Sequence, residues 1–126
     1  MTNPSDVPLR RGHIVVVELD PALGAEQRKT RPAVIVSNDG ANTAAGRTGY
    51  GVITVVPLTG AANRTGRPRP FQAAIAADES GLGRDCTAQA EQVRTISIGR
   101  VVRLAGGLGA EAMARLDAAL RVHLAL

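Results

Sequence analysis

The sequence is poor in cysteine, histidine and long apolar runs. Its single cysteine, Cys86, cannot form a disulfide within the chain, and two histidines are too few for a Cys/His metal cluster. No apolar run approaches the ~18 residues of a membrane helix, and the N-terminus lacks the apolar segment of an export signal. We therefore expect a cytoplasmic protein with no membrane association, with a disordered tail over residues 1–10 and one domain over residues 11–126.

Aromatic residues and lysine are also scarce. Tyr50 and Phe71 are the only aromatic residues, so a base-stacking platform of the RRM or OB type has almost nothing to stack on. Lys29 is the only lysine among 15 basic residues, and the net charge is +4. Biased codon usage would also favour arginine, but it does not explain the positive sign. A basic domain of this kind indicates nucleic-acid binding, here chiefly through charge and hydrogen bonds.

Short apolar runs separated by turn residues dominate the chain and predict five or six strands. The runs lie at residues 13–19, 32–37, 52–58, 71–76, 87–93 and 99–104. Pro57 interrupts the third run and predicts an edge or a bulge near its end. Asn38 begins a turn or helix-cap signal, and residues 42–51 are small and polar and predict an exposed segment.

One clear helix is predicted at the C-terminus. Its apolar residues recur at steps of three and four, and they are Met113, Leu116, Leu120 and Leu124. Two ion pairs at a spacing of four residues, Glu111 with Arg115 and Asp117 with Arg121, are expected along it. Glycines 106, 107 and 109 are expected to separate it from the preceding strand. The fold class is therefore mainly β: a small, half-open antiparallel β-barrel with a C-terminal α-helix.

The loop before the second strand concentrates polar residues suited to chemistry. Residues 24–32 place Arg28, Lys29 and Arg31 close to one carboxylate, Glu26. Arg31 stands where the chain enters the strand, and the following proline restricts its backbone to an extended shape. Its side chain should therefore be better positioned than one at a loop tip. Cations that simply solvate a hairpin are the ordinary alternative.

Two further segments carry candidate residues. Thr59 lies at the end of the third predicted strand, where a threonine most often caps a turn. Glu91 and Arg94 flank a short extended segment, where an ion pair is the ordinary interpretation. Residues 60–70 are expected to form a basic loop with Arg64, Arg67 and Arg69.

Several motifs in order resemble the MazF/PemK family of toxin–antitoxin endoribonucleases. They are Arg11-Gly12-His13-Ile14, Leu19-Asp20-Pro21, Gly24-Ala25-Glu26-Gln27, Arg31-Pro32-Ala33-Val34-Ile35-Val36-Ser37-Asn38, Val55 to Thr59, and Glu91-Gln92-Val93-Arg94-Thr95-Ile96. The resemblance spans residues 10–124. It implies an SH3-like barrel, a homodimer, and sequence-selective cleavage of single-stranded RNA, mRNA included, with neither metal nor other cofactor and independently of the ribosome. It also implies attack by the RNA 2′-hydroxyl, leaving a 5′-hydroxyl and a cyclic or 3′-phosphate.

The family's functional residues fall on matching positions here. The resemblance implies that Arg31 and Thr59 are the essential pair, and that Glu91 is a candidate base. Arginine is a poor proton donor because its pKa exceeds ~12, so Arg31 is assigned mainly to electrostatic stabilisation. The assignment of general acid and general base stays open. The expected RNA-binding residues are Glu26, Gln27, Arg28, Lys29, Arg64, Arg67, Arg69 and Arg94.

The resemblance also implies a partner, a cognate antitoxin whose acidic, partly disordered segment covers the basic groove. A gyrase-poisoning toxin of the same fold is the alternative function. Such toxins act by protein binding through a Trp-Gly-Ile C-terminus, whereas this chain has no tryptophan and ends His123-Leu124-Ala125-Leu126. A third possibility, an RNA-binding module without catalysis, is disfavoured because Arg31 and Thr59 are both present.

Overall fold

The computed structural model describes residues 8–60 and 67–126, so Arg64 lies outside the described residues. Its strands are β1 (His13–Glu18), β2 (Thr30–Ile35), β3 (Val52–Gly60), β4 (Gln72–Ile75), β5 (Cys86–Gln89), β6 (Arg94–Ser97) and β7 (Val101–Gly107). Its helices are α1 (Asp39–Thr48), α2 (Ala77–Ser80) and α3 (Ala110–Leu124), and two 3-10 turns are η3 (Ala90–Gln92) and η4 (Ile98–Arg100). No helix in this part of the chain is long and apolar enough to span a membrane.

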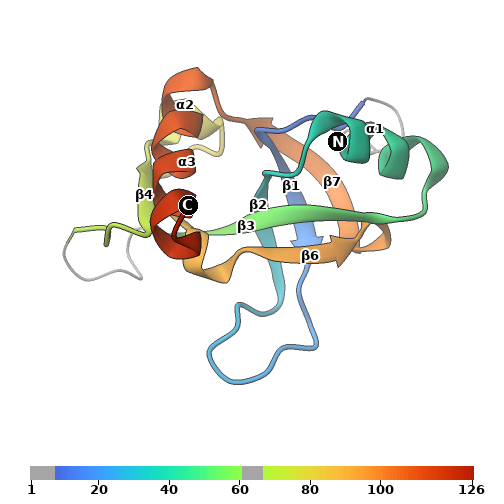
Figure 1. Cartoon of the computed structure of the whole chain (residues 1–126), viewed down its shortest axis with the longest axis horizontal. Coiled ribbons are helices and arrows are strands. Elements are labelled where there is room, and N and C mark those ends of the chain that lie inside the picture. The colour runs from blue at the N-terminus through green and yellow to red at the C-terminus, as the bar shows by residue number, and fades with distance from the viewer. Residues whose placement is uncertain (1–7, 61–66) are drawn as a thin grey trace.

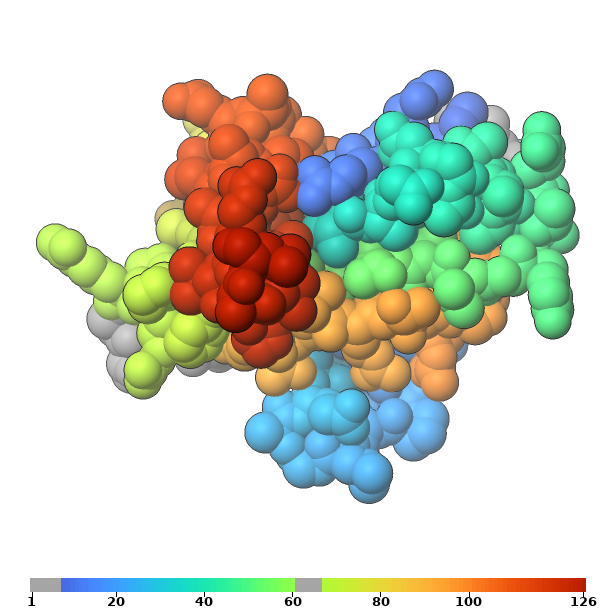
Figure 2. All heavy atoms as spheres, in the orientation of Figure 1, coloured from blue at the N-terminus to red at the C-terminus, as the bar shows by residue number. Residues whose placement is uncertain are grey.

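The strands form one antiparallel sheet in the order β4-β5-β3-β2-β1-β7, with β6 paired to the first half of β3 (Figure 1). The sheet curls without closing, which confirms the predicted half-open, mainly β fold with a C-terminal helix. The loop between β1 and β2 projects away from the body of the molecule (Figure 2, light blue).

Strand β3 runs unbroken through Pro57, although an edge or a bulge was predicted there. The reason is a change of partner strand. β6 pairs with β3 up to Val55, and β5 pairs with it from Leu58 onward. Pro57 lies between these two ladders, where neither β6 nor β5 pairs with it, and this is a position at which a missing N–H group is tolerated.

Both faces of the central strands are buried, which explains their continuous β-branched composition. One face, with Ile14 and Val34, packs under α3 against Leu116. The other face carries Val15 and Ile35. A second set of residues covers that face: Leu9, Ala45 of α1, Ile53, Ile96 and Ile98. Because Leu9 is fully buried, order begins within the segment predicted as a loose tail, while residues 1–7 lie outside the described chain.

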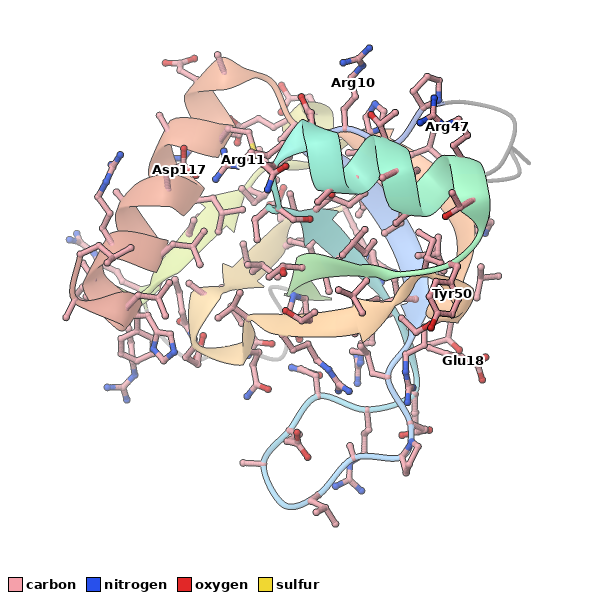
Figure 3. All side chains as sticks on the ribbon, turned by 45° about the vertical axis from the view of Figure 1, so that its right-hand side comes forward. Arg10, Arg11, Glu18, Arg47, Tyr50 and Asp117 are labelled. Atoms are coloured by element: carbon pink, nitrogen blue, oxygen red, sulfur yellow. The ribbon has the colours of Figure 1, made fainter. Side chains whose placement is uncertain are left out.

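The predicted terminal helix is present, but its two predicted ion pairs are not the ones formed. Arg115 reaches Glu79 at the end of α2 (2.6 Å), and Asp117 pairs with Arg11 (2.6 Å) (Figure 3). The hydrogen bond from Arg115 holds the pKa of the Glu79 carboxyl below its usual value. The helix lies against the sheet, so its charged side chains meet partners on other elements before their neighbours four residues away.

Helix α1 occupies the segment predicted only as small, polar and exposed. The helix is stabilised by the caps at its two ends and by a hydrogen bond to the N-terminal segment. The Asn38 side chain accepts a hydrogen bond from the Ala41 backbone N–H (2.9 Å), and Gly49 ends the helix with a φ of 69°. The Arg11 backbone N–H donates to the Asp39 carboxylate (2.6 Å), which lowers the pKa of that group. Arg11 therefore joins α1 to α3.

Several predicted strand boundaries were wrong, and β6 was not predicted as a strand. Strand β7 continues to Gly107 instead of ending at residue 104, and Gly106 is needed within it because a Cβ there would lie 2.4 Å from the Ser80 carbonyl oxygen. The run predicted as a strand over residues 87–93 leaves the sheet after Gln89 and turns into η3. This turn changes the direction of the segment that carries Glu91.

Candidate active site

The two residues expected to form the essential pair lie on neighbouring strands. The recorded β2–β3 pairs run from Ile35↔Val55 to Ala33↔Pro57. Continued two residues beyond the last recorded pair, this register would put Arg31 opposite Thr59. Alternation along each strand puts both residues on the face that carries Ala33 and Val55, at the end where β2 and β3 stop pairing. The sheet therefore brings these two positions to one rim.

The side chains of this pair are available for a ligand. Arg31 is half-buried and donates from Nε to the Arg28 carbonyl oxygen (3.1 Å), which fixes the plane of its guanidinium. Neither terminal nitrogen of Arg31 bonds to a residue in the described ranges. The Thr59 hydroxyl also has no hydrogen-bond partner there, while its backbone pairs with Thr87 of β5. Terminal guanidinium N–H groups and a hydroxyl at one rim are donors suited to phosphate oxygens.

Glu91 lies on η3, beside β4. Its Oε2 accepts a hydrogen bond from Gln72 Nε2 (2.6 Å), and its Oε1 is buried with no partner among the residues described. One carboxylate oxygen is thus held in place and the other is left with unused acceptor capacity. No hydrogen bond in this part of the structure links Glu91 to Arg31 or Thr59, so the structure does not join the three candidates into one contacting group.

A network of glutamines attaches the β1–β2 loop to η3. The Gln92 side chain accepts from the Gln27 backbone N–H (3.1 Å) and donates to the Ala25 carbonyl oxygen (3.1 Å). The Gln27 side chain also donates to the Gln89 side chain. Two polar segments that lie more than 60 residues apart in the sequence are therefore held together. Sequence reasoning did not single out Gln72, because no local pattern distinguishes it.

Several of the expected RNA-binding residues have structural contacts instead of free donors. The Glu26 carboxylate accepts from the Leu23 backbone N–H within its own loop (2.7 Å). The half-buried Arg94 lies on the same face as Arg31 and donates to the Leu19 carbonyl oxygen (3.4 Å). Gln27 belongs to the glutamine network described above.

The other expected binding residues in the described ranges are exposed cations of the β1–β2 loop and of the segment before β4. Arg28 donates to the Gly24 carbonyl oxygen (3.0 Å), while Lys29 adopts a positive φ of 68°. Arg67 and Arg69 are exposed, and the side chains of Lys29, Arg67 and Arg69 have no partner in the parts of the chain that the structure describes. These four side chains can approach a polyanion without first breaking an ion pair.

Comparisons with known proteins found matches over most of the chain. A family model described as PemK-like, MazF-like toxin of type II toxin-antitoxin system matches residues 10–124. A Mycobacterium tuberculosis protein named Endoribonuclease MazF9 is 50% identical over 118 residues, covering 94% of this chain and 98% of that protein. The predicted family is thereby confirmed, and the gyrase-poisoning alternative is not favoured.

Solved structures show the same fold at lower identity. MazF from Deinococcus radiodurans superposes with a TM-score of 0.74 at 23% identity, covering 96% of this chain and 100% of the other. A mycobacterial endoribonuclease in complex with its cognate antitoxin gives a TM-score of 0.70 at 22% identity, covering 95% of this chain and 97% of the other. With its half-open sheet and its matched residues, the chain belongs to the family of PemK-like, MazF-like toxins of type II toxin–antitoxin systems.

Proposed function

We propose that this chain, an endoribonuclease toxin of the MazF/PemK family, cleaves single-stranded RNA at a phosphate held by Arg31 and Thr59. The observation that carries the proposal is the β2–β3 register, which, continued two residues past its last recorded pair, would bring both residues to one face at the open end of the sheet. Their free donors support it, because a phosphate undergoing attack gains negative charge on its non-bridging oxygens.

The proposed reaction uses the RNA's own 2′-hydroxyl as nucleophile. Its oxygen bonds to the adjacent phosphorus, its proton passes to a base, and the bond from phosphorus to the 5′-oxygen breaks as that oxygen takes up a proton. The products are a 2′,3′-cyclic phosphate, which can open to a 3′-phosphate, and a 5′-hydroxyl. Arg31 stabilises the charge on the phosphate oxygens, and Thr59 donates a hydrogen bond to the same group.

Glu91 is the proposed base. Its Oε1, which has no partner in the described part of the chain, supports this role, because a carboxylate oxygen with no hydrogen bond is free to accept a proton. For Oε1 to act, RNA binding must bring the 2′-hydroxyl to this buried atom.

The remaining predicted residues divide into two groups under this proposal. Arg28, Lys29, Arg67 and Arg69 attract the RNA backbone, and Arg64, outside the described residues, is expected to join them. Glu26, Gln27 and Arg94 act by holding the loop and the rim in shape, as their hydrogen bonds suggest. Direct contacts to RNA from these three are then secondary.

The proposed partner is a cognate antitoxin whose acidic segment covers the cationic rim. Membership of a toxin–antitoxin family and the antitoxin bound to a structural relative support this proposal. We also propose that the toxin is a homodimer and that it acts in the cytoplasm, where its RNA substrate is found.

The test is the cleavage of a defined single-stranded RNA by purified protein in the presence of EDTA, followed by analysis of the fragment ends. The expected fragments carry a 5′-hydroxyl and a cyclic or 3′-phosphate. Arg31→Ala should lower the rate by a factor of ~10²–10³, because one preorganised donor at developing charge contributes about 3–4 kcal/mol. A 5′-phosphate, or loss of activity with EDTA, would contradict the mechanism.

A further inference from the structure

A second groove lies on the face of β2 opposite to Arg31. It encloses about 400 Å³, and its polar lining consists of Thr30, Arg84 and Arg103 over a floor that includes Val16 and Pro32. It is formed where β1, β2 and β7 run side by side and the loop after α2 approaches them (Figure 1). The proposed catalytic residues are absent from its lining.

The groove exists because α3 covers one end of this sheet face and leaves the other end open. Ile14 and Val34 lie under the helix, in the core cluster that contains Leu116. Two residues further toward the loop, Val16 and Pro32 are half-buried and form the groove floor. Thr30, Pro32 and Arg103 alternate onto this face, and Thr30 immediately precedes Arg31 in β2. The groove and the catalytic rim therefore meet at the first residues of one strand.

The two arginines of the groove have no counter-charge among the residues that the structure describes. Arg103 is half-buried and Arg84 is exposed, and neither guanidinium forms a hydrogen bond or an ion pair within residues 8–60 and 67–126. Arg11 and Arg115, by contrast, are both in ion pairs. Because neither guanidinium has a partner among the described residues, an anion supplied from outside can bind them without first breaking an ion pair.

No carboxylate in the described chain supplies that anion. No acidic residue lines the groove. Glu18 lies two residues from Val16 on the same face but forms no ion pair with Arg103. Asp85, next to Arg84 in the sequence, already accepts a hydrogen bond from the Ala77 backbone N–H (3.0 Å). The groove therefore has two positive charges, one hydroxyl and an apolar floor.

We propose that this groove binds a backbone phosphate of the RNA at a nucleotide outside the scissile one. Arg103 takes the phosphate through its paired N–H groups, Arg84 and Thr30 add further contacts, and the sugar of that nucleotide lies on the apolar floor. The inference rests on the proposed RNA cleavage. The groove holds the RNA where it passes the N-terminal end of β2. It therefore contributes to RNA affinity and leaves the rate of the chemical step unchanged.

The test measures binding of a single-stranded RNA whose scissile 2′-hydroxyl is replaced by hydrogen, which prevents cleavage, over a range of salt concentrations. Arg103→Gln should raise Kd roughly tenfold, as expected for loss of a charge-assisted bidentate contact. The slope of the logarithm of the RNA association constant against the logarithm of the salt concentration should shrink by about 0.7 for each phosphate contact removed. Arg84→Ala should shrink this slope as well. Arg103→Lys should recover the slope, because it restores the charge.

Arg47→Ala is the matched control, because Arg47 is an exposed arginine on α1, away from the groove, and its guanidinium has no partner among the described residues (Figure 3). It should leave the slope unchanged. With cleavable RNA, Arg103→Gln should raise KM and keep kcat. The thermal midpoint of each variant confirms that it is folded.

Three results would overturn the proposal. The first is wild-type affinity and slope in both groove variants. The second is a fall in kcat at saturating RNA with KM unchanged. The third is unchanged RNA binding with weakened binding of an acidic peptide, which would make the groove a protein-binding surface. Failure of the wild-type protein to bind RNA at all would instead contradict the proposed function.

Discussion

The attachment of the β1–β2 loop by Gln92 leads to a prediction about both loop order and RNA affinity. Gln92→Ala removes two hydrogen bonds, one from the Gln27 backbone N–H and one to the Ala25 carbonyl oxygen. Each such bond contributes ~0.5–1.5 kcal/mol, so the loop should lose about 1–3 kcal/mol of local stability. That loss corresponds to a roughly 5- to 150-fold rise in the population of the detached loop.

Amide hydrogen exchange measures this loss directly. The Gln27 amide should exchange faster in Gln92→Ala by a factor within that range. The Leu19 amide, which donates to the Lys29 carbonyl oxygen at the base of the loop (2.9 Å), should keep its protection. Because the loop carries Arg28 and Lys29, KM for RNA should rise with the exchange rate.

The matched control is Gln72→Ala, which removes the donor to Glu91 but no contact with the loop. It should leave the exchange rate of the Gln27 amide unchanged. Wild-type protection of Gln27 in Gln92→Ala would show that the loop is ordered by other contacts, and the reasoning would be refuted. A faster exchange with unchanged KM would show that loop order does not contribute to RNA binding.

Three further predictions concern the fold that supports the rim. Leu116→Ala should lower the free energy of unfolding by about 2–5 kcal/mol in a denaturant titration, because Leu116 is fully buried between α3 and the sheet, and a loss under 1 kcal/mol would contradict this packing. Gly106→Ala should lower the thermal midpoint, because its Cβ would lie 2.4 Å from a backbone oxygen of Ser80, and a wild-type midpoint would contradict this close approach. The pKa of Glu79 is lowered by the hydrogen bond from Arg115, so its contribution to stability is present above its unfolded pKa and is lost as the pH falls through the lower folded pKa. Stability of Glu79→Gln should therefore fall less steeply than that of the wild type below about pH 4.3, and parallel pH profiles would contradict the interaction.

Most of the strands, though not β6, and the terminal helix could be predicted because their signals are local. The β-branched run of β1 and the spacing of Leu116 and Leu120 both record burial within a single element. Helix α1 could not be predicted in this way. It holds the weak helix formers Gly40 and Gly46, and it depends on its caps and on the backbone of Arg11, 28 residues from its partner Asp39.

The candidate site was predictable only in part for the same reason. Arg31, Thr59 and Glu91 could be named from motifs, but their arrangement depends on strand register and on the turn at η3. The predicted ion pairs within α3 failed because sequence spacing cannot show that Glu79 and Arg11 lie closer. The contacts of Gln92 are likewise set by tertiary structure.

The most direct test of the central claim is a double-mutant cycle on kcat/KM for RNA cleavage, with Arg31→Ala, Thr59→Val and the double variant. If both side chains bind one scissile phosphate, the effects should be coupled, and the double variant should lose much less than the product of the two single losses. Fully multiplicative losses would show that the two residues act on the RNA independently, and the account of a shared phosphate site would be contradicted.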